Sequence, residues 1–97
     1  MYLTYLGQAY RLTGQYEEAV TTLRKALTFN SDLWDTHLQL AATYSELDRE
    51  KEAQAEVAEA LRIYPQTSLE LIRQRSLQKD PALLERGLAA LRKAGLK

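Results

Sequence analysis

Apolar residues recur along this chain at spacings of three and four, which is the period of an α-helix with one buried face. The pattern predicts four helices over about residues 2–13, 16–28, 33–47 and 50–63. Gly14 is expected to end the first helix, because glycine readily takes a positive φ, and Pro65 to end the fourth, because proline disfavours helical backbone in the residue before it. Ser31 or Asp32 is expected to cap the third helix.

The remainder of the chain has the pattern of two further helices. The first is short, runs over SLELIRQR, and is expected to be capped by Thr67 or Ser68. The second is expected to begin at Asp80-Pro81, since Asp is a good helix cap and Pro suits the first helical position. Its apolar stripe runs up to Gly95 and consists of Leu83, Leu84, Leu88, Leu91 and Ala94.

The first four predicted helices form two pairs that are related by a constant shift of 34 residues. Small residues then fall on small ones and large apolar residues on large ones. The matching positions are Leu6 and Leu40, Gly7 and Ala41, Tyr10 and Tyr44, Ala19 and Ala53, Leu23 and Val57, Ala26 and Ala60, and Ser31 and Pro65. We interpret the small residues as contact points between closely crossing helices, since larger side chains would push the helices apart.

These positions resemble the signature of the tetratricopeptide repeat (TPR), whose length is also 34 residues. Two repeats are identified, over residues 1–31 and 32–66. The resemblance implies an all-α fold, a right-handed α-solenoid of two helix-turn-helix repeats, followed by capping helices in residues 67–97. The positions that depart from the family pattern are Leu3, His37, Ala41 and Ser31.

In this family the first helix of each repeat lines a concave groove that holds a peptide or partner protein. The resemblance places in that groove Thr4, Tyr5, Gln8, Arg11, Leu12, Asp35, Leu38, Gln39, Ala42 and Ser45. Some members bind the C-terminal carboxylate of heat-shock chaperones through Lys and Asn, but Thr4 and Gln8 stand at those places here. We therefore expect a protein or peptide partner other than a chaperone tail, with Arg11 able to pair with an acidic group.

The segment 67–97 follows the repeat only in part. A further shift of 34 residues supplies the small, large and small residues of a second helix, at Gly87, Leu91 and Ala94. Polar residues fall on the apolar positions of the first helix, at Gln74, Arg75 and Gln78. The segment is interpreted as a degenerate third repeat that caps the second, or as a dimerisation segment that exchanges with a second copy. The anchors expected in both cases are Leu84, Leu88 and Leu91.

The tail carries a second resemblance, in Tyr64-Pro65, in Lys79-Asp80-Pro81 and in the run from Leu84 to Leu96. These residues are similar to the C-terminus of bacterial proteins in which TPR repeats follow a class III adenylate/guanylate cyclase domain. The alternative function is therefore an oligomerisation or regulatory module of a larger bacterial protein. No catalytic residue of a cyclase is present in the chain, so any such activity would belong to the host protein.

The first helix begins without the polar cap that end repeats of solenoids usually carry. Tyr2, Tyr5 and Leu6 are therefore expected to be partly open. The hypothesis is that the chain is part of a longer array or covers this end by self-association.

Composition argues against several classes of function. The 97 residues include 13 basic and 13 acidic ones, so the chain lacks the basic surplus of nucleic-acid-binding proteins. Cysteine is absent and His37 is the single histidine, which leaves too few ligands for a zinc site. No apolar run has the roughly 18 residues that a membrane span needs. We expect a soluble, cytoplasmic, non-catalytic protein with no cofactor or metal and no nucleic-acid or membrane partner, and in the alternative interpretation a homodimer.

Overall fold

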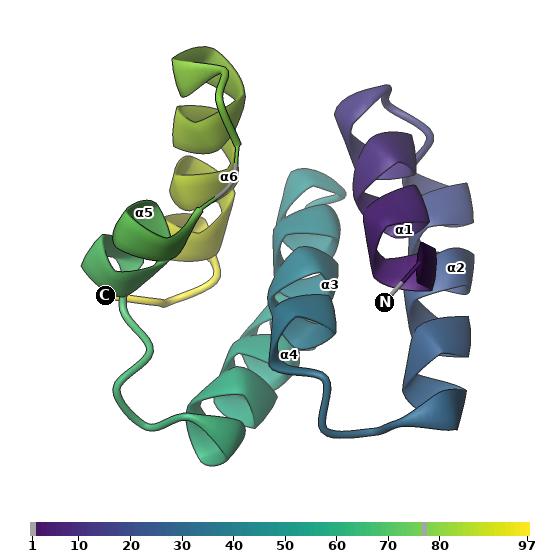
Figure 1. Cartoon of the computed structure of the whole chain (residues 1–97), viewed down its shortest axis with the longest axis horizontal. Helices are drawn as coiled ribbons and strands as arrows, with labels where there is room; N and C mark the ends of the chain where they lie inside the picture. Colours follow the sequence, from purple (N-terminus) through teal and green to yellow (C-terminus); the bar gives the residue numbers. More distant parts are fainter. Residues whose placement is uncertain (1, 77) are drawn as a thin grey trace.

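The computed structural model describes residues 2–76 and 78–97, which form six α-helices and, within these ranges, no β-strand (Figure 1). The helices are α1 (Tyr2–Leu12), α2 (Tyr16–Phe29), α3 (Trp34–Glu46), α4 (Glu50–Ile63), α5 (Leu69–Arg75) and α6 (Pro81–Lys93). The boundaries of the first four lie within one residue of those that the apolar pattern predicts. None of the described helices is both long and apolar enough to cross a membrane.

The same turn joins the two helices of each repeat. Gly14 has a φ of 81°, and Asp48, which follows it by the repeat length, has a φ of 60°. In both turns the next backbone N–H donates at 2.8 Å to a tyrosine carbonyl, from Gln15 to Tyr10 and from Arg49 to Tyr44. Gly14 ends its helix as predicted, whereas the left-handed Asp48 was not predicted, because aspartate takes this conformation less freely than glycine. The repeat is therefore present in the backbone as well as in the sequence.

The prediction that Ser31 or Asp32 caps α3 is wrong. The residue before the helix is Leu33, and its side chain makes no capping hydrogen bond. Asp32 instead pairs with Arg62, with 2.7 Å between Oδ1 and Nη2. The carbonyl of Ser31 accepts a hydrogen bond of 2.8 Å from Nε2 of His37. Contacts with α3 and α4 thus hold this loop in place of a local cap.

The core lies between the paired helices, where the sequence has its small residues. Ala19, Ala26, Ala53 and Ala60 are fully buried. At Gly7 a Cβ atom would lie 2.5 Å from the side chain of Leu23, well inside van der Waals contact. Close approach of α1 and α2 therefore depends on the absence of a side chain at this position.

The two helices of the tail begin where the sequence predicts. The hydroxyl of Ser68 accepts a hydrogen bond of 3.0 Å from the N–H of Leu71, which makes Ser68 rather than Thr67 the cap of α5. The carboxylate of Asp80 accepts one of 2.9 Å from the N–H of Ala82, and Pro81 is the first residue of α6.

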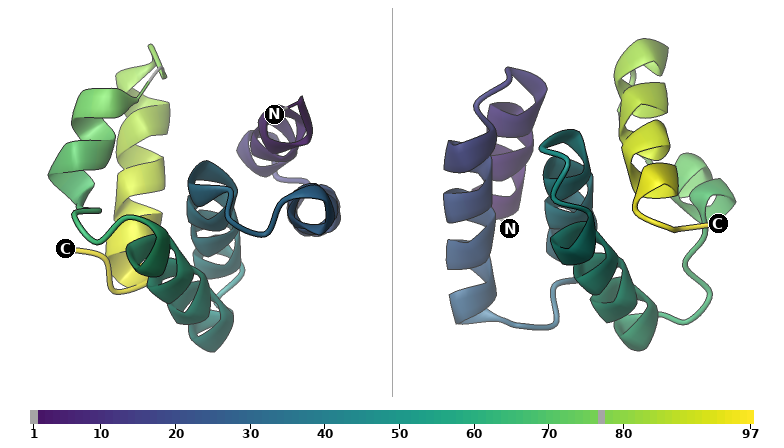
Figure 2. Two further views of the ribbon diagram at one scale, coloured as in Figure 1. Left: turned by 60° about the horizontal axis from the view of Figure 1, so that its bottom comes forward. Right: turned by 180° about the vertical axis from the view of Figure 1, so that it is seen from behind.

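Helix α6 packs against α3 and α5, so the tail lies beside the first helix of the second repeat (Figures 1 and 2). The repeat register placed α6 differently, as the second helix of a third repeat, which would pack on α5 and away from α3. Helix α5 has only 7 residues and no fully buried side chain, so it cannot cover α3. The apolar stripe of α6 covers α3 instead, and Leu88 and Leu91 are buried there.

Candidate functional site

A cavity of about 630 Å³ lies between α1, α3 and α6, and residues from the end of α5 complete it. Helix α3 lies in the middle, between α1 and α6, as Figure 1 shows. The volume falls in the range of roughly 300 to 1,000 Å³ that is usual for ligand clefts. The cavity is thus large enough for a short peptide segment and too small for a folded domain.

Most of the residues predicted to form a groove line this cavity. They are Tyr5, Gln8, Arg11 and Leu12 from α1, and Asp35, Leu38, Gln39 and Ala42 from α3. Thr4 and Ser45 do not line it. The hydroxyls of Thr4 and Thr36 share a hydrogen bond of 2.6 Å between α1 and α3. Ser45 is buried, and its hydroxyl has no hydrogen-bond partner among the described residues.

The tail forms a wall of the cavity that the sequence did not indicate. Leu84, Leu88 and Leu91, the expected cap or dimer anchors, all line it. Leu88 is 1% and Leu91 5% exposed, so both are packed within the chain. The sequence had singled out their apolar stripe, but nothing in it assigned the stripe to α3. The further lining residues that it missed include Trp34, Ile72, Arg75, Gln78, Leu83 and Gly87.

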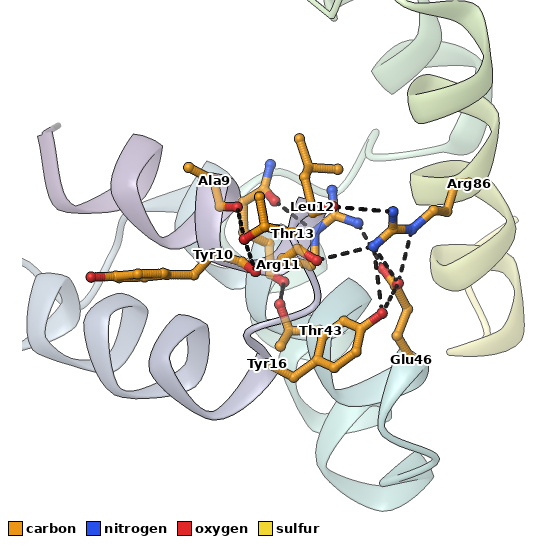
Figure 3. Close-up of polar contacts among 10 residues, drawn as sticks. Ala9, Tyr10, Arg11, Leu12, Thr13, Tyr16, Thr43, Glu46 and Arg86 are labelled. Carbon is orange, nitrogen blue, oxygen red and sulfur yellow. Dashed lines mark hydrogen bonds and ion pairs between the residues drawn. The ribbon is translucent and has the colours of Figure 1, made fainter.

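An ionic cluster joins α1, α3 and α6 at the C-terminal end of α3 (Figure 3). The carboxylate of Glu46 accepts hydrogen bonds from Arg11 Nη1 at 2.7 Å and from Arg86 Nε at 3.1 Å. The hydroxyl of Tyr16 donates to the same carboxylate at 3.1 Å. The Arg11 side chain is only 4% exposed, so its charge depends on Glu46 for compensation. The expectation that Arg11 pairs with an acidic partner is therefore wrong, since that pairing is made within the chain.

Arg86 also bonds to the end of α1. Its Nη2 donates to the carbonyl of Arg11 at 3.0 Å and its Nη1 to that of Leu12 at 3.5 Å. The C-terminus of a helix carries a partial negative charge, which makes this a favourable place for a guanidinium. These bonds hold α6 at a fixed distance from α1 and so fix the width of the cavity.

The N-terminal end of α3 is less fully paired. Asp35 lines the cavity and makes no hydrogen bond or ion pair with its side chain in the described part of the chain. It is open to solvent through the mouth of the cavity, yet burial by the surrounding atoms raises the pKa of its carboxyl above the usual value. Its neighbour Trp34 packs edge-on against Tyr64, with ring centroids 6.1 Å apart, and donates to the Thr67 hydroxyl at 2.8 Å.

His37 lies outside the cavity and is buried in a second polar cluster. Its Nδ1 is 2.7 Å from the carboxylate of Glu56, and its Nε2 bonds to the Ser31 carbonyl. Both partners are acceptors, so the protonated ring satisfies both and a neutral ring satisfies one. Glu56 also accepts from Arg24 at 3.2 Å. Within the described residues no cluster of His, Asp and Glu is arranged to hold a metal ion.

Comparison with protein families identifies the repeats. A model described as "TPR repeat" matches residues 7–48, and one described as "Tetratricopeptide repeat" matches residues 35–67. Together they cover residues 7–67, more than half of the 97 residues. The chain belongs to the tetratricopeptide repeat family. The predicted all-α TPR fold, with additional helices after the repeats, is thereby confirmed.

The other comparisons add no relative. Searches among curated proteins and among solved structures find no match to the chain. The TPR models end at residue 67 and do not include the tail. The resemblance of the tail to that of cyclases therefore stays a hypothesis.

The TPR assignment gives the cavity a meaning. Repeats of this family generally mediate contacts between proteins, and their inner helices correspond here to α1 and α3. Thr4 stands at a position where chaperone-binding members have a cation, and it is buried against Thr36. This groove therefore lacks one of the groups that hold a terminal carboxylate.

Proposed function

We propose that this TPR chain is a non-catalytic interaction module that binds a short segment of a partner protein between α1, α3 and α6. The observation that supports this most is the cavity itself, which lies along the inner helices of the repeats. Leu38 and Ala42 of α3 and Leu91 of α6 supply apolar surface, as anchor side chains of a peptide require. Gln8 and Gln39 place amide groups beside this surface, where they can bond to a peptide backbone.

Tyr5 is the proposed contact that can be tested with least effect on the fold. It is 60% exposed, lines the cavity and offers an aromatic face to a ligand. Aromatic residues in binding sites often contribute more than 1 kcal/mol when truncated, so we expect Tyr5→Ala to weaken peptide binding by about tenfold. Peptides would be selected from a random phage-displayed library and their affinities measured by fluorescence anisotropy.

Tyr2→Ala is the matched control for this experiment. Tyr2 lies on the same helix, is 74% exposed and does not line the cavity. We expect its removal to leave the affinity unchanged. Failure to select any peptide, or equal losses in the two variants, would contradict the proposed function.

The alternative function is an oligomerisation or regulatory module of a larger bacterial protein, such as a cyclase. One observation favours it, the exposure of large apolar side chains outside the cavity at Tyr2 and Phe29. Leu88 and Leu91 are buried within the chain, so a dimer through them requires exchange of α6 between copies. A cytoplasmic location, and the absence of nucleic-acid and membrane partners, remain predictions.

The proposed function predicts a monomer in solution. Light scattering over a concentration series should give the mass of one chain at every concentration, since α6 meets its apolar surface on α3 of its own chain. A mass that doubles with concentration, and returns to that of one chain in a Tyr2→Ala, Phe29→Ala variant, would support the alternative instead.

A further inference from the structure

We propose that the segment bound in the cavity carries one basic side chain, a lysine or arginine, that pairs with Asp35, while the side chains next to it are apolar. This inference rests on the proposed function and specifies the chemistry of the partner. It follows from the charges that line the cavity and from how each of them is paired.

Three charged residues line the cavity, and their states differ. Arg11 is compensated by Glu46 at 2.7 Å. The guanidinium of Arg75, from α5, lies 5.7 Å from the centroid of the Tyr64 ring. Asp35 is the one carboxylate among the described lining residues, and no described cation lies within ion-pair distance of it. A ligand that enters the cavity therefore meets a negative charge whose partner it must bring.

The fold does not explain the carboxylate at this position. Glu46 and Glu56, the two carboxylates most closely surrounded by cations and donors, each hold helices together through short bonds. Asp35 makes no such bond, and burial of a charge without a partner is unfavourable. An asparagine of nearly the same shape would avoid that cost. This makes a role in binding a better account of Asp35 than a role in stability.

The remaining cavity surface limits the ligand further. Leu38, Leu84 and Leu91 present apolar side chains, so residues next to the basic one must be apolar to bury them. Arg75 disfavours a run of basic residues, because a second cation would meet a guanidinium with no described carboxylate to screen it. An acidic peptide tail would bring like charge to Asp35. A single basic side chain within an apolar segment satisfies all three conditions.

The test compares peptides selected on matched proteins. A random phage-displayed library would be selected on the wild type, on Asp35→Asn and on Glu50→Gln, which neutralises an exposed carboxylate of α4 outside the cavity. All three proteins would carry an acetylated N-terminus, so that a free terminal amine does not compete for Asp35. We expect one lysine or arginine among apolar residues in peptides from the wild type and Glu50→Gln, and no such preference with Asp35→Asn.

A double-mutant cycle then isolates the pair. For the best peptide, replacement of its basic residue by norleucine should weaken binding to the wild type by about five- to tenfold and to Asp35→Asn by less than about twofold. The thermal midpoint of Asp35→Asn should equal or exceed that of the wild type, since an unpaired carboxylate is removed. A lower midpoint would show that Asp35 serves the fold and would overturn the inference.

The outcomes separate this inference from the function on which it rests. If no peptide is enriched on any of the proteins, the proposed function fails and the inference with it. If peptides are enriched but lack a basic residue, or if norleucine weakens binding equally to the wild type and to Asp35→Asn, the inference fails and the groove function stands.

Discussion

Replacement of Glu46 by alanine is expected to lower the free energy of unfolding by about 3–5 kcal/mol, the cost of leaving a buried charge without its partner. Arg11 is 4% exposed and would lose its carboxylate, and Arg86 would lose the group that joins it to α3. Two guanidiniums would then remain near each other at the end of the cavity. Urea denaturation followed by linear extrapolation measures the change.

Two further variants test this explanation. Glu52→Ala removes a carboxylate that is 43% exposed and paired with the exposed Arg49, so we expect a loss below about 1 kcal/mol. Adding Arg11→Met and Arg86→Met to Glu46→Ala should recover most of the stability, because apolar residues of similar volume can replace a buried ionic group. Equal losses for Glu46→Ala and Glu52→Ala would contradict a buried cluster.

The second large effect is expected at Gly7. Gly7→Ala should lower stability by about 1–2 kcal/mol, because overpacking costs about 1–3 kcal/mol and the better helix propensity of alanine returns up to about 1. The added Cβ would lie 2.5 Å from two carbons of Leu23, a side chain that is fully buried. Thermal or urea denaturation of the purified variant measures this loss.

The structure supplies a control and a rescue for this prediction. Gly87→Ala adds the same methyl group to α6, where the nearest atom is the end of the Arg11 side chain at 3.6 Å, so it should leave stability unchanged or raise it by up to about 1 kcal/mol. The second repeat has Ala41 and Val57 at the positions of Gly7 and Leu23. Gly7→Ala combined with Leu23→Val should therefore be more stable than Gly7→Ala alone. If it is less stable, the contact with Leu23 is not the cause.

The sequence predicted the fold well because its signals are local and repeated. Gly14, Ser68 and Asp80 mark helix ends through bonds or conformations that involve near neighbours in the chain. The groove positions on α1 and α3 followed from the register, and those that line the cavity do so because the repeat places one helix face along it. Thr4 and Ser45 lie on the same helices but are turned into helix contacts.

What the sequence did not predict depends on contacts between distant residues. Arg86 reads as a surface residue of a polar helix face, and only the packing of α6 on α3 brings it to Glu46. Asp32 and Ser31 have the chemistry of helix caps, yet contacts with Arg62 and His37 engage them first. No periodic pattern reports such pairings, because each occurs once.

The bonds from Arg86 to the end of α1 have a consequence for how the chain unfolds. In most repeat arrays each unit touches only its neighbours, so stability is a sum of local terms and the end units can fray first. Here Arg86 joins residues 74 and 75 positions away, so the last helix is bonded to the first. Neither end can detach without breaking a contact of the other. The chain should therefore unfold as one cooperative unit rather than repeat by repeat.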